Sequence, residues 1–226
     1  MKWQNLVIFF VALGMVACRQ SPSSEDRAGI EKEKLADGVL RKAAAQVKRE
    51  TGLRPAGTIG QMLREVQILG LSFDYCKPID IAEGRQLLLK AADTLLGEVN
   101  RETRIHPYLI RCPFAIRNVE IEIFLSTPEG GDVAPGSLRV IDLCGGVLRY
   151  QIAHPKRRGF LTIYKETHKE ALERLADPSL PLASFQPDPE STPEELAKLR
   201  KNVSFVSDDG SIWHLDPNGS WIKDPK

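Results

Sequence analysis

The chain has 226 residues, of which 42% are hydrophobic and 27% are charged, a composition typical of a soluble globular protein. This length suits one ordinary domain with appendages or two small domains. Lysine and arginine number 31 against 30 aspartate and glutamate residues, which gives no electrostatic case for binding nucleic acid or an acidic membrane surface.

The N-terminus carries the most specific functional signal. Lys2 precedes an apolar run from Leu6 to Ala17, and these 12 residues are followed by Cys18. A bilayer span needs roughly 20 apolar residues, so the run predicts a cleaved signal peptide over residues 1–17. The ending Met-Val-Ala-Cys resembles the lipobox of bacterial lipoproteins, although Met15 stands where leucine is usual. The alternative is an ordinary signal peptide followed by an incidental cysteine.

The resemblance to a lipobox implies that Cys18 is lipidated and becomes the first residue of the mature protein. Several acyl chains, each methylene contributing about 0.8 kcal/mol, would anchor it durably in a membrane of the cell envelope. Arg19 follows the cysteine in place of an acidic residue, which by the same resemblance permits sorting to the outer membrane. Residues 18–26 are then a short polar tether.

Residues 27–176 are expected to form the main domain. Apolar residues recur at helical spacing from Ile30 to Glu50, and Gly52 marks the end of this predicted helix. Residues 52–60 contain three glycines and a proline and predict a loop. Residues 65–75 then predict a first strand.

A second helix is predicted from Asp80, with Glu83 completing a capping box. Because a helix separates the first strand from the next one at Asn118, the pattern indicates a right-handed crossover between parallel strands. The intervening residues 105–114 hold two prolines and are expected to form an ordered loop.

The clearest pattern lies between Arg117 and Lys165, where four runs of alternating apolar and polar residues predict an antiparallel meander. Gly145-Gly146 predicts a two-residue hairpin turn, because a type I′ turn requires positive φ at both positions. This turn sets Asp142 opposite Arg149 on one face and places Ile141 and Tyr150 on the core face.

The segment before the meander contains a further pattern, which is followed by a strand and consists of Ile105, Pro107, Tyr108, Leu109, Pro113 and Phe114. With this pattern at its centre, the chain over about residues 52–175 resembles an uncharacterised protein family of obligate intracellular bacteria. His106 and Cys112 depart from the arginine and tyrosine usual in that family. The resemblance supports the domain limits and implies no activity.

Beyond the meander, residues 166–176 predict a short helix. Residues 177–202 are expected to form a proline-rich linker with one further short helix. The final segment, residues 203–226, contains Asp-Gly-Ser and Asn-Gly-Ser turn signals and predicts a tail of two β-hairpins.

Signals for catalysis are weak. The four histidines are scattered, and no pair has the spacing of metal ligands, so no metal or cofactor is predicted. One constellation remains, in which Cys144 would act with Asp142 and with His106 brought near by the crossover. Glu120 and Glu122 form an alternative pair of acids. A structural role for Cys144 is the default interpretation.

The same topology sorts the cysteines that remain after lipidation. Cys76 follows the first strand at one end of the sheet, whereas Cys112 and Cys144 lie at the opposite end. The arrangement therefore permits a Cys112–Cys144 disulfide and excludes one to Cys76.

Together these patterns predict an α+β, two-layer domain with a mainly antiparallel sheet and helices on one face. The expected function is that of a lipid-anchored envelope protein of binding or scaffolding type, whose partners are the membrane and another protein. The alternative is an envelope hydrolase that uses Cys144 or the carboxylate pair. A pocket lined by these groups would favour the hydrolase, and an exposed apolar patch elsewhere would favour binding.

Overall fold

The computed structural model describes residues 24–134, 136–153 and 159–180, together with three short C-terminal strands. The predicted signal peptide, Cys18 and most of the predicted linker, including its helix, lie outside the described residues. Within the described part of the chain, no helix is both long and apolar enough to cross a membrane.

The main domain contains three α-helices, two short 3-10 helices and six strands among its described residues. In chain order these are α1 Ser24–Thr51, β1 Arg54–Gln61, β2 Ile68–Tyr75, α2 Ile81–Arg101, η1 Thr103–Tyr108, η2 Ile116–Asn118, β3 Val119–Leu125, β4 Leu138–Cys144, β5 Val147–Ala153, β6 Phe160–Thr167 and α3 His168–Ala176.

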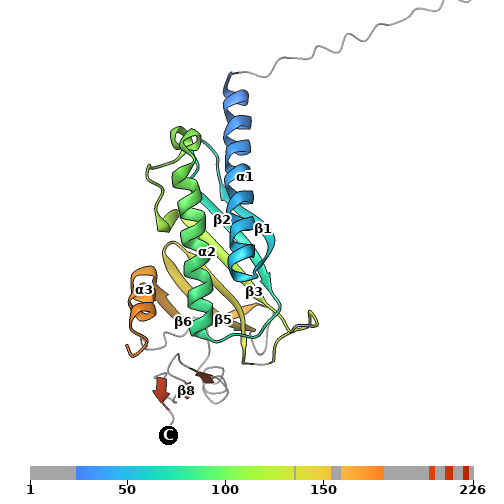
Figure 1. Cartoon of the computed structure of the whole chain (residues 1–226), viewed down its shortest axis with the longest axis vertical. Coiled ribbons are helices and arrows are strands. Elements are labelled where there is room, and N and C mark those ends of the chain that lie inside the picture. The colour runs from blue at the N-terminus through green and yellow to red at the C-terminus, as the bar shows by residue number, and fades with distance from the viewer. Residues whose placement is uncertain are drawn as a thin grey trace, which may run out of the picture.

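The six strands form one sheet in the order β1 to β6, and of its five pairings only that of β2 with β3 is parallel. Helix α2 connects the two parallel strands, and β3 to β6 form the antiparallel meander. Figure 1 shows α1 and α2 side by side across one face of the sheet. The predicted α+β fold, the crossover connection and the four-strand meander are therefore confirmed.

The core lies between the helices and this face of the sheet. Along β3, Val119, Ile121, Ile123 and Leu125 are fully buried, and the residues between them point to the other face. Helix α2 buries a stripe that includes Leu88, Ala91, Leu95 and Val99.

The turn between β4 and β5 is the predicted one. Gly145 and Gly146 have φ angles of +60° and +82°, the left-handed conformation that a type I′ turn requires at both positions. Asp142 lies opposite Arg149, and Ile141 lies opposite Tyr150, so the predicted register is confirmed.

The predicted loop over residues 52–60 is wrong, because most of it forms β1. This strand lies at the edge of the sheet and pairs only with β2, and nearly all its side chains are exposed. Pro55 cannot donate a backbone hydrogen bond, and the register shifts between Pro55 and Gly57. Edge strands tolerate proline and need no buried face, so β1 lacks the apolar alternation by which sequence patterns reveal strands.

Several element boundaries also differ from the predicted ones. Helix α1 begins at Ser24, inside the segment predicted as tether, and β2 begins at Ile68 instead of residue 65. Asp80 caps α2 by accepting a 2.8 Å hydrogen bond from the backbone of Glu83, but the Glu83 carboxylate binds Lys77 at 2.7 Å instead of closing the capping box.

The last three strands form a separate small sheet, with β8 Ile212–Leu215 between β7 Ser204–Val206 and β9 Trp221–Lys223. Both pairings are antiparallel, which confirms the predicted tail of two hairpins.

Candidate functional site

The face of the sheet opposite the helices carries most of the polar residues singled out from the sequence. We call it the outer face, and its central row is formed by register neighbours on five strands: Ser72, Glu122, Asp142, Arg149 and Lys165. Helices α1, α2 and α3 contact the strands of the sheet, and the alternating apolar residues of the other face, the core face, are buried. The alternation of the strands therefore gathers these polar groups on one surface.

Asp142 is the centre of this row and is almost fully buried, with 3% of its surface exposed. Arg149 binds one carboxylate oxygen at 2.6 Å and 2.7 Å through two of its nitrogens, and Gln151 donates to the other oxygen. Burial raises the pKa of Asp142 above its usual value, although Arg149 and Gln151 act in the opposite direction. The carboxylate is thus held by neighbouring side chains and is not free to act as a base.

Cys144 lies next to this row, at the end of β4. Its thiol donates a 3.2 Å hydrogen bond to the Glu120 carboxylate. Burial raises the pKa of the thiol, and both the hydrogen bond to Glu120 and the negative charge of that carboxylate raise it further. A nucleophilic cysteine needs the thiolate form, and this environment favours the thiol.

His106 does not complete a catalytic constellation with Cys144. The histidine lies in η1, where its Nε2 atom is 3.1 Å from the backbone carbonyl oxygen of Asn100. Asp142 binds Arg149 and Gln151. The structure therefore brings Cys144 and Asp142 to one face, as the sequence indicated, but it places the imidazole in a different contact.

The carboxylate pair lies on the outer face, and each member accepts a hydrogen bond from a neighbouring strand. Glu120 accepts from Cys144, and Glu122 accepts from Ser72 at 3.1 Å. Among the described residues, no group of three or more histidine, cysteine, aspartate or glutamate side chains could hold a metal ion.

Apolar side chains extend the outer face toward the end where β3 finishes and β6 begins. Phe124 is 36% exposed and lies opposite the buried Val140, and Phe160 is 46% exposed and lies opposite Ala153. Lys165 is exposed on the same face. The outer face thus presents two exposed aromatic rings near polar groups, and aromatic side chains surrounded by a polar rim are common in protein-binding surfaces.

The possible Cys112–Cys144 disulfide is not formed in the structure, where all three described cysteines are free. Cys144 does lie near the start of β3, because its thiol contacts Glu120, as the topology predicted. Cys112 is exposed in the loop before β3. The pattern of strands predicted at which end of the sheet each cysteine lies. It could not predict the direction of the Cys112 side chain, because this residue lies in a loop.

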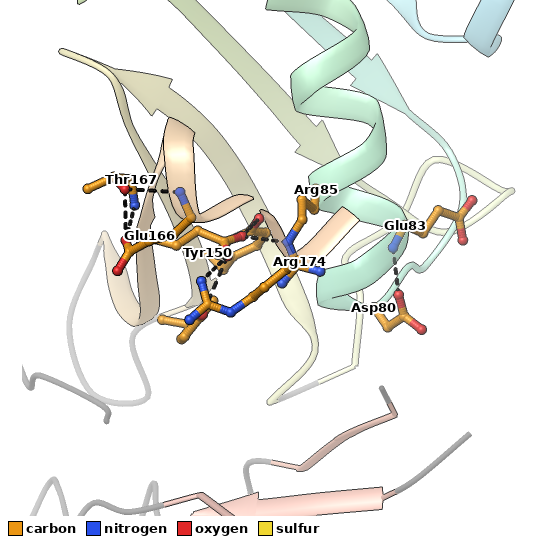
Figure 2. Close-up of polar contacts among 9 residues, drawn as sticks. Asp80, Glu83, Arg85, Tyr150, Glu166, Thr167 and Arg174 are labelled. Carbon is orange, nitrogen blue, oxygen red and sulfur yellow. Dashed lines mark hydrogen bonds and ion pairs between the residues drawn. The ribbon is translucent and has the colours of Figure 1, made fainter. Parts of the chain in front are cut away.

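A buried ionic network was not identified from the sequence. Glu166 at the end of β6 has a side chain with 0% exposure, and it accepts hydrogen bonds from Arg85 at 2.8 Å and Tyr150 at 2.6 Å. Arg174 of α3 binds its other oxygen at 3.1 Å. Figure 2 shows these side chains converging from α2, α3 and the sheet. The network joins three elements inside the core and is a structural feature.

The sequence contained one signal for this network. Arg85 lies four residues after Ile81 and three before Leu88, both buried, so it occupies the apolar stripe of α2. A charged residue in such a stripe requires a buried partner of opposite charge.

Comparisons of the chain with protein-family models, with curated proteins and with solved structures found no match.

Proposed function

We propose that this protein is a lipid-anchored protein of the cell envelope that binds another protein through the outer face of its sheet. The observation that carries the proposal is the outer face itself, which presents the exposed rings of Phe124 and Phe160 together with the polar row and its exposed Lys165. The signal-like N-terminus and Cys18 support the anchor, because they resemble a lipoprotein signal sequence.

The environment of Cys144 favours binding over hydrolysis. Its thiol is a hydrogen-bond donor to a carboxylate, its pKa is raised by burial and by Glu120, and the His106 ring contacts Asn100 instead. Within the central row, Glu122 binds Ser72 and Asp142 binds Arg149, so these groups are held in place as part of a preformed surface. Preformed surfaces lose little conformational freedom on binding.

Site-specific photocrosslinking in native membranes tests this proposal. A photoreactive side chain at Lys165 is expected to form an adduct with one protein partner. The same side chain at Gln86, which is exposed on α2 on the helical side of the domain, is the matched control and is expected to form none. Adducts of equal yield at both positions, or no adduct at Lys165, would contradict binding through the outer face.

Two substitutions connect the adduct to the outer face and separate binding from catalysis. Phe124→Glu is expected to abolish the Lys165 adduct, since it replaces an exposed aromatic ring with a charge. Cys144→Ala is expected to leave the adduct unchanged. Hydrolysis of an envelope substrate that Cys144→Ala abolishes would instead favour the hydrolase.

A further inference from the structure

The end of the domain at which α1 begins carries an apolar side chain that the fold does not use. Leu63, in the turn between β1 and β2, is 85% exposed, far more than any other large apolar residue of the described chain. Ile110, in the neighbouring segment, is 45% exposed. We call residues 62–67 and 109–112 together the tip.

The tip is held in a defined conformation. The Lys32 ammonium, on a residue only 6% exposed, donates to the backbone carbonyls of Met62 and Leu63 at 2.8 Å and of Arg64 at 3.3 Å. Val66 accepts a 3.1 Å hydrogen bond from the backbone N–H of Ile110, which fixes the second segment beside the turn. Lys32, which belongs to α1, thus binds three carbonyls of the turn and fixes its backbone. The exposure of Leu63 is therefore a feature of the fold.

Two arginines flank the apolar residues of the tip. Arg64 and Arg111 are both exposed, and neither has an ion-pair partner within the described part of the chain. Glu65 is the one acidic residue of the tip. Exposed apolar side chains beside arginines are typical of protein surfaces that meet the headgroup region of a bilayer.

The short length of chain between Cys18 and the tip indicates that the surface next to the tip is the membrane. Lys32 lies eight residues after the start of α1 at Ser24, a rise of roughly 12 Å along a helix. Cys18 precedes Ser24 by six residues, and six residues reach at most roughly 20 Å. The start of α1 lies at the upper end of the domain in Figure 1, so an anchor at Cys18 would hold this end near the membrane.

We propose that the tip contacts the lipid surface, with Leu63 and Ile110 at the level of the headgroups and Arg64 and Arg111 beside the phosphates. This inference rests on the anchor in the proposed function. The contact orients the domain, since the acyl chains already supply the attachment. The outer face would then be held in a fixed direction relative to the membrane.

Fluorescence quenching by lipids tests this contact. The mature lipidated protein, with Trp213→Phe and Trp221→Phe as background, is reconstituted in vesicles of phosphatidylethanolamine and phosphatidylglycerol with brominated acyl chains. Leu63→Trp is expected to lose a large part of its emission, because a ring at the level of the headgroups lies close to the brominated chains. Phe124→Trp, on the outer face at the far end of β3, is the matched control and is expected to keep its emission.

A second pair of variants tests the role of Leu63 directly. Ile110→Trp is expected to be quenched like Leu63→Trp, and adding Leu63→Asp is expected to remove most of that quenching. Unquenched Leu63→Trp and Ile110→Trp in protein that still floats with the vesicles would overturn the lipid contact while leaving the anchor intact. Equal quenching of Leu63→Trp and Phe124→Trp would also overturn it.

Two further outcomes distinguish a lipid from a protein at the tip, and failure of the tip contact from failure of the Cys18 anchor. If Leu63→Trp is shielded from aqueous iodide in native membranes but is not quenched in the lipid vesicles, the occupant is a protein and the lipid contact is wrong. Protein purified from membranes without acyl chains on Cys18 would instead contradict the anchor, and with it the reason for placing the tip at the membrane.

Discussion

At Cys144 burial and a hydrogen bond to Glu120 together favour the thiol over the thiolate. The thiol donates to Glu120, and both burial and this carboxylate raise its pKa. Only the thiolate reacts rapidly with alkylating reagents, so a raised pKa slows the reaction at neutral pH. The exposed Cys112 lies in a loop of the same domain and provides an internal reference.

We therefore expect iodoacetamide to modify Cys144 several-fold more slowly than Cys112 at neutral pH, as measured by mass spectrometry of peptides. Glu120→Gln removes the negative charge beside the thiol, so it is expected to speed the modification of Cys144. Glu122→Gln, whose side chain binds Ser72, is the control and is expected to change nothing. Modification of Cys144 at the same rate as Cys112 would contradict the raised pKa of Cys144 and would favour a catalytic role for this thiol.

Glu166 is the residue on which the buried network depends. Its carboxylate has 0% exposure and binds both Arg85 and Arg174. Attraction to Glu166 outweighs burial at Arg85, where desolvation alone would lower the pKa, and the net effect raises it.

Removing one partner from a buried ion pair leaves an uncompensated charge, which costs about 3–5 kcal/mol. We expect Glu166→Gln to lower the free energy of unfolding by about this amount in urea titrations. Glu173→Gln, at a residue whose side chain is 52% exposed, is the matched control and is expected to change stability by less than about 0.5 kcal/mol. Equal losses in the two variants would show that the network contributes little.

At the scale of elements, the pairing of β2 with β3 depends on the absence of a side chain at Gly70. A Cβ atom at this position would lie 2.5 Å from the carbonyl oxygen of Glu120 and 3.0 Å from the Cβ atom of Ile59. Both distances are too short, so the adjacent strands approach closely because this residue is glycine.

Gly70→Ala is therefore expected to destabilise the domain by about 1–3 kcal/mol through overpacking against the backbone. Gly57→Ala on β1 is the matched control, because its Cβ atom would lie 3.9 Å from the nearest atom. That substitution is expected to be neutral or to stabilise by up to about 1 kcal/mol. A urea midpoint for Gly70→Ala equal to that of the original protein would contradict the close approach.

The elements also show which parts of the fold could be predicted from the sequence. The meander was predictable because period-two alternation and Gly145-Gly146 fix both the buried face and the register. β1 was not, because an exposed edge strand is defined by backbone pairing and leaves no apolar pattern. Glu166 was missed because one of its ionic partners, Arg85, lies on α2, which is far from β6 in sequence and reaches Glu166 only in the folded domain.

The candidate site was predictable only in part, for the same physical reason. Register alone placed Asp142, Cys144 and Arg149 on one face. It could not show that Cys144 binds Glu120, because that contact depends on the pairing of β3 with β4 and on side-chain direction. The tip was missed because its significance lies in the exposure of Leu63 and in the hold of Lys32 on the turn.

On the scale of the whole molecule, the start of α1, the tip and the outer face are arranged along the long direction of the domain. The chain leaves the domain at the start of α1, the tip lies near this end, and the outer face extends along the strands away from it. A lipid anchor at Cys18 would make these features a membrane-proximal contact and a laterally presented binding surface.

Lipidation of Cys18 is the feature on which the proposed role depends most directly, and metabolic labelling with radioactive palmitate tests it. We expect label in the protein, and a mature chain that begins at Cys18 when its mass is measured. Cys18→Ser is expected to abolish the label and leave the precursor uncleaved, whereas Cys112→Ser, the matched control, should retain both label and cleavage. Label that persists in Cys18→Ser, or a mature chain that begins at another residue without acyl chains, would contradict the membrane anchor.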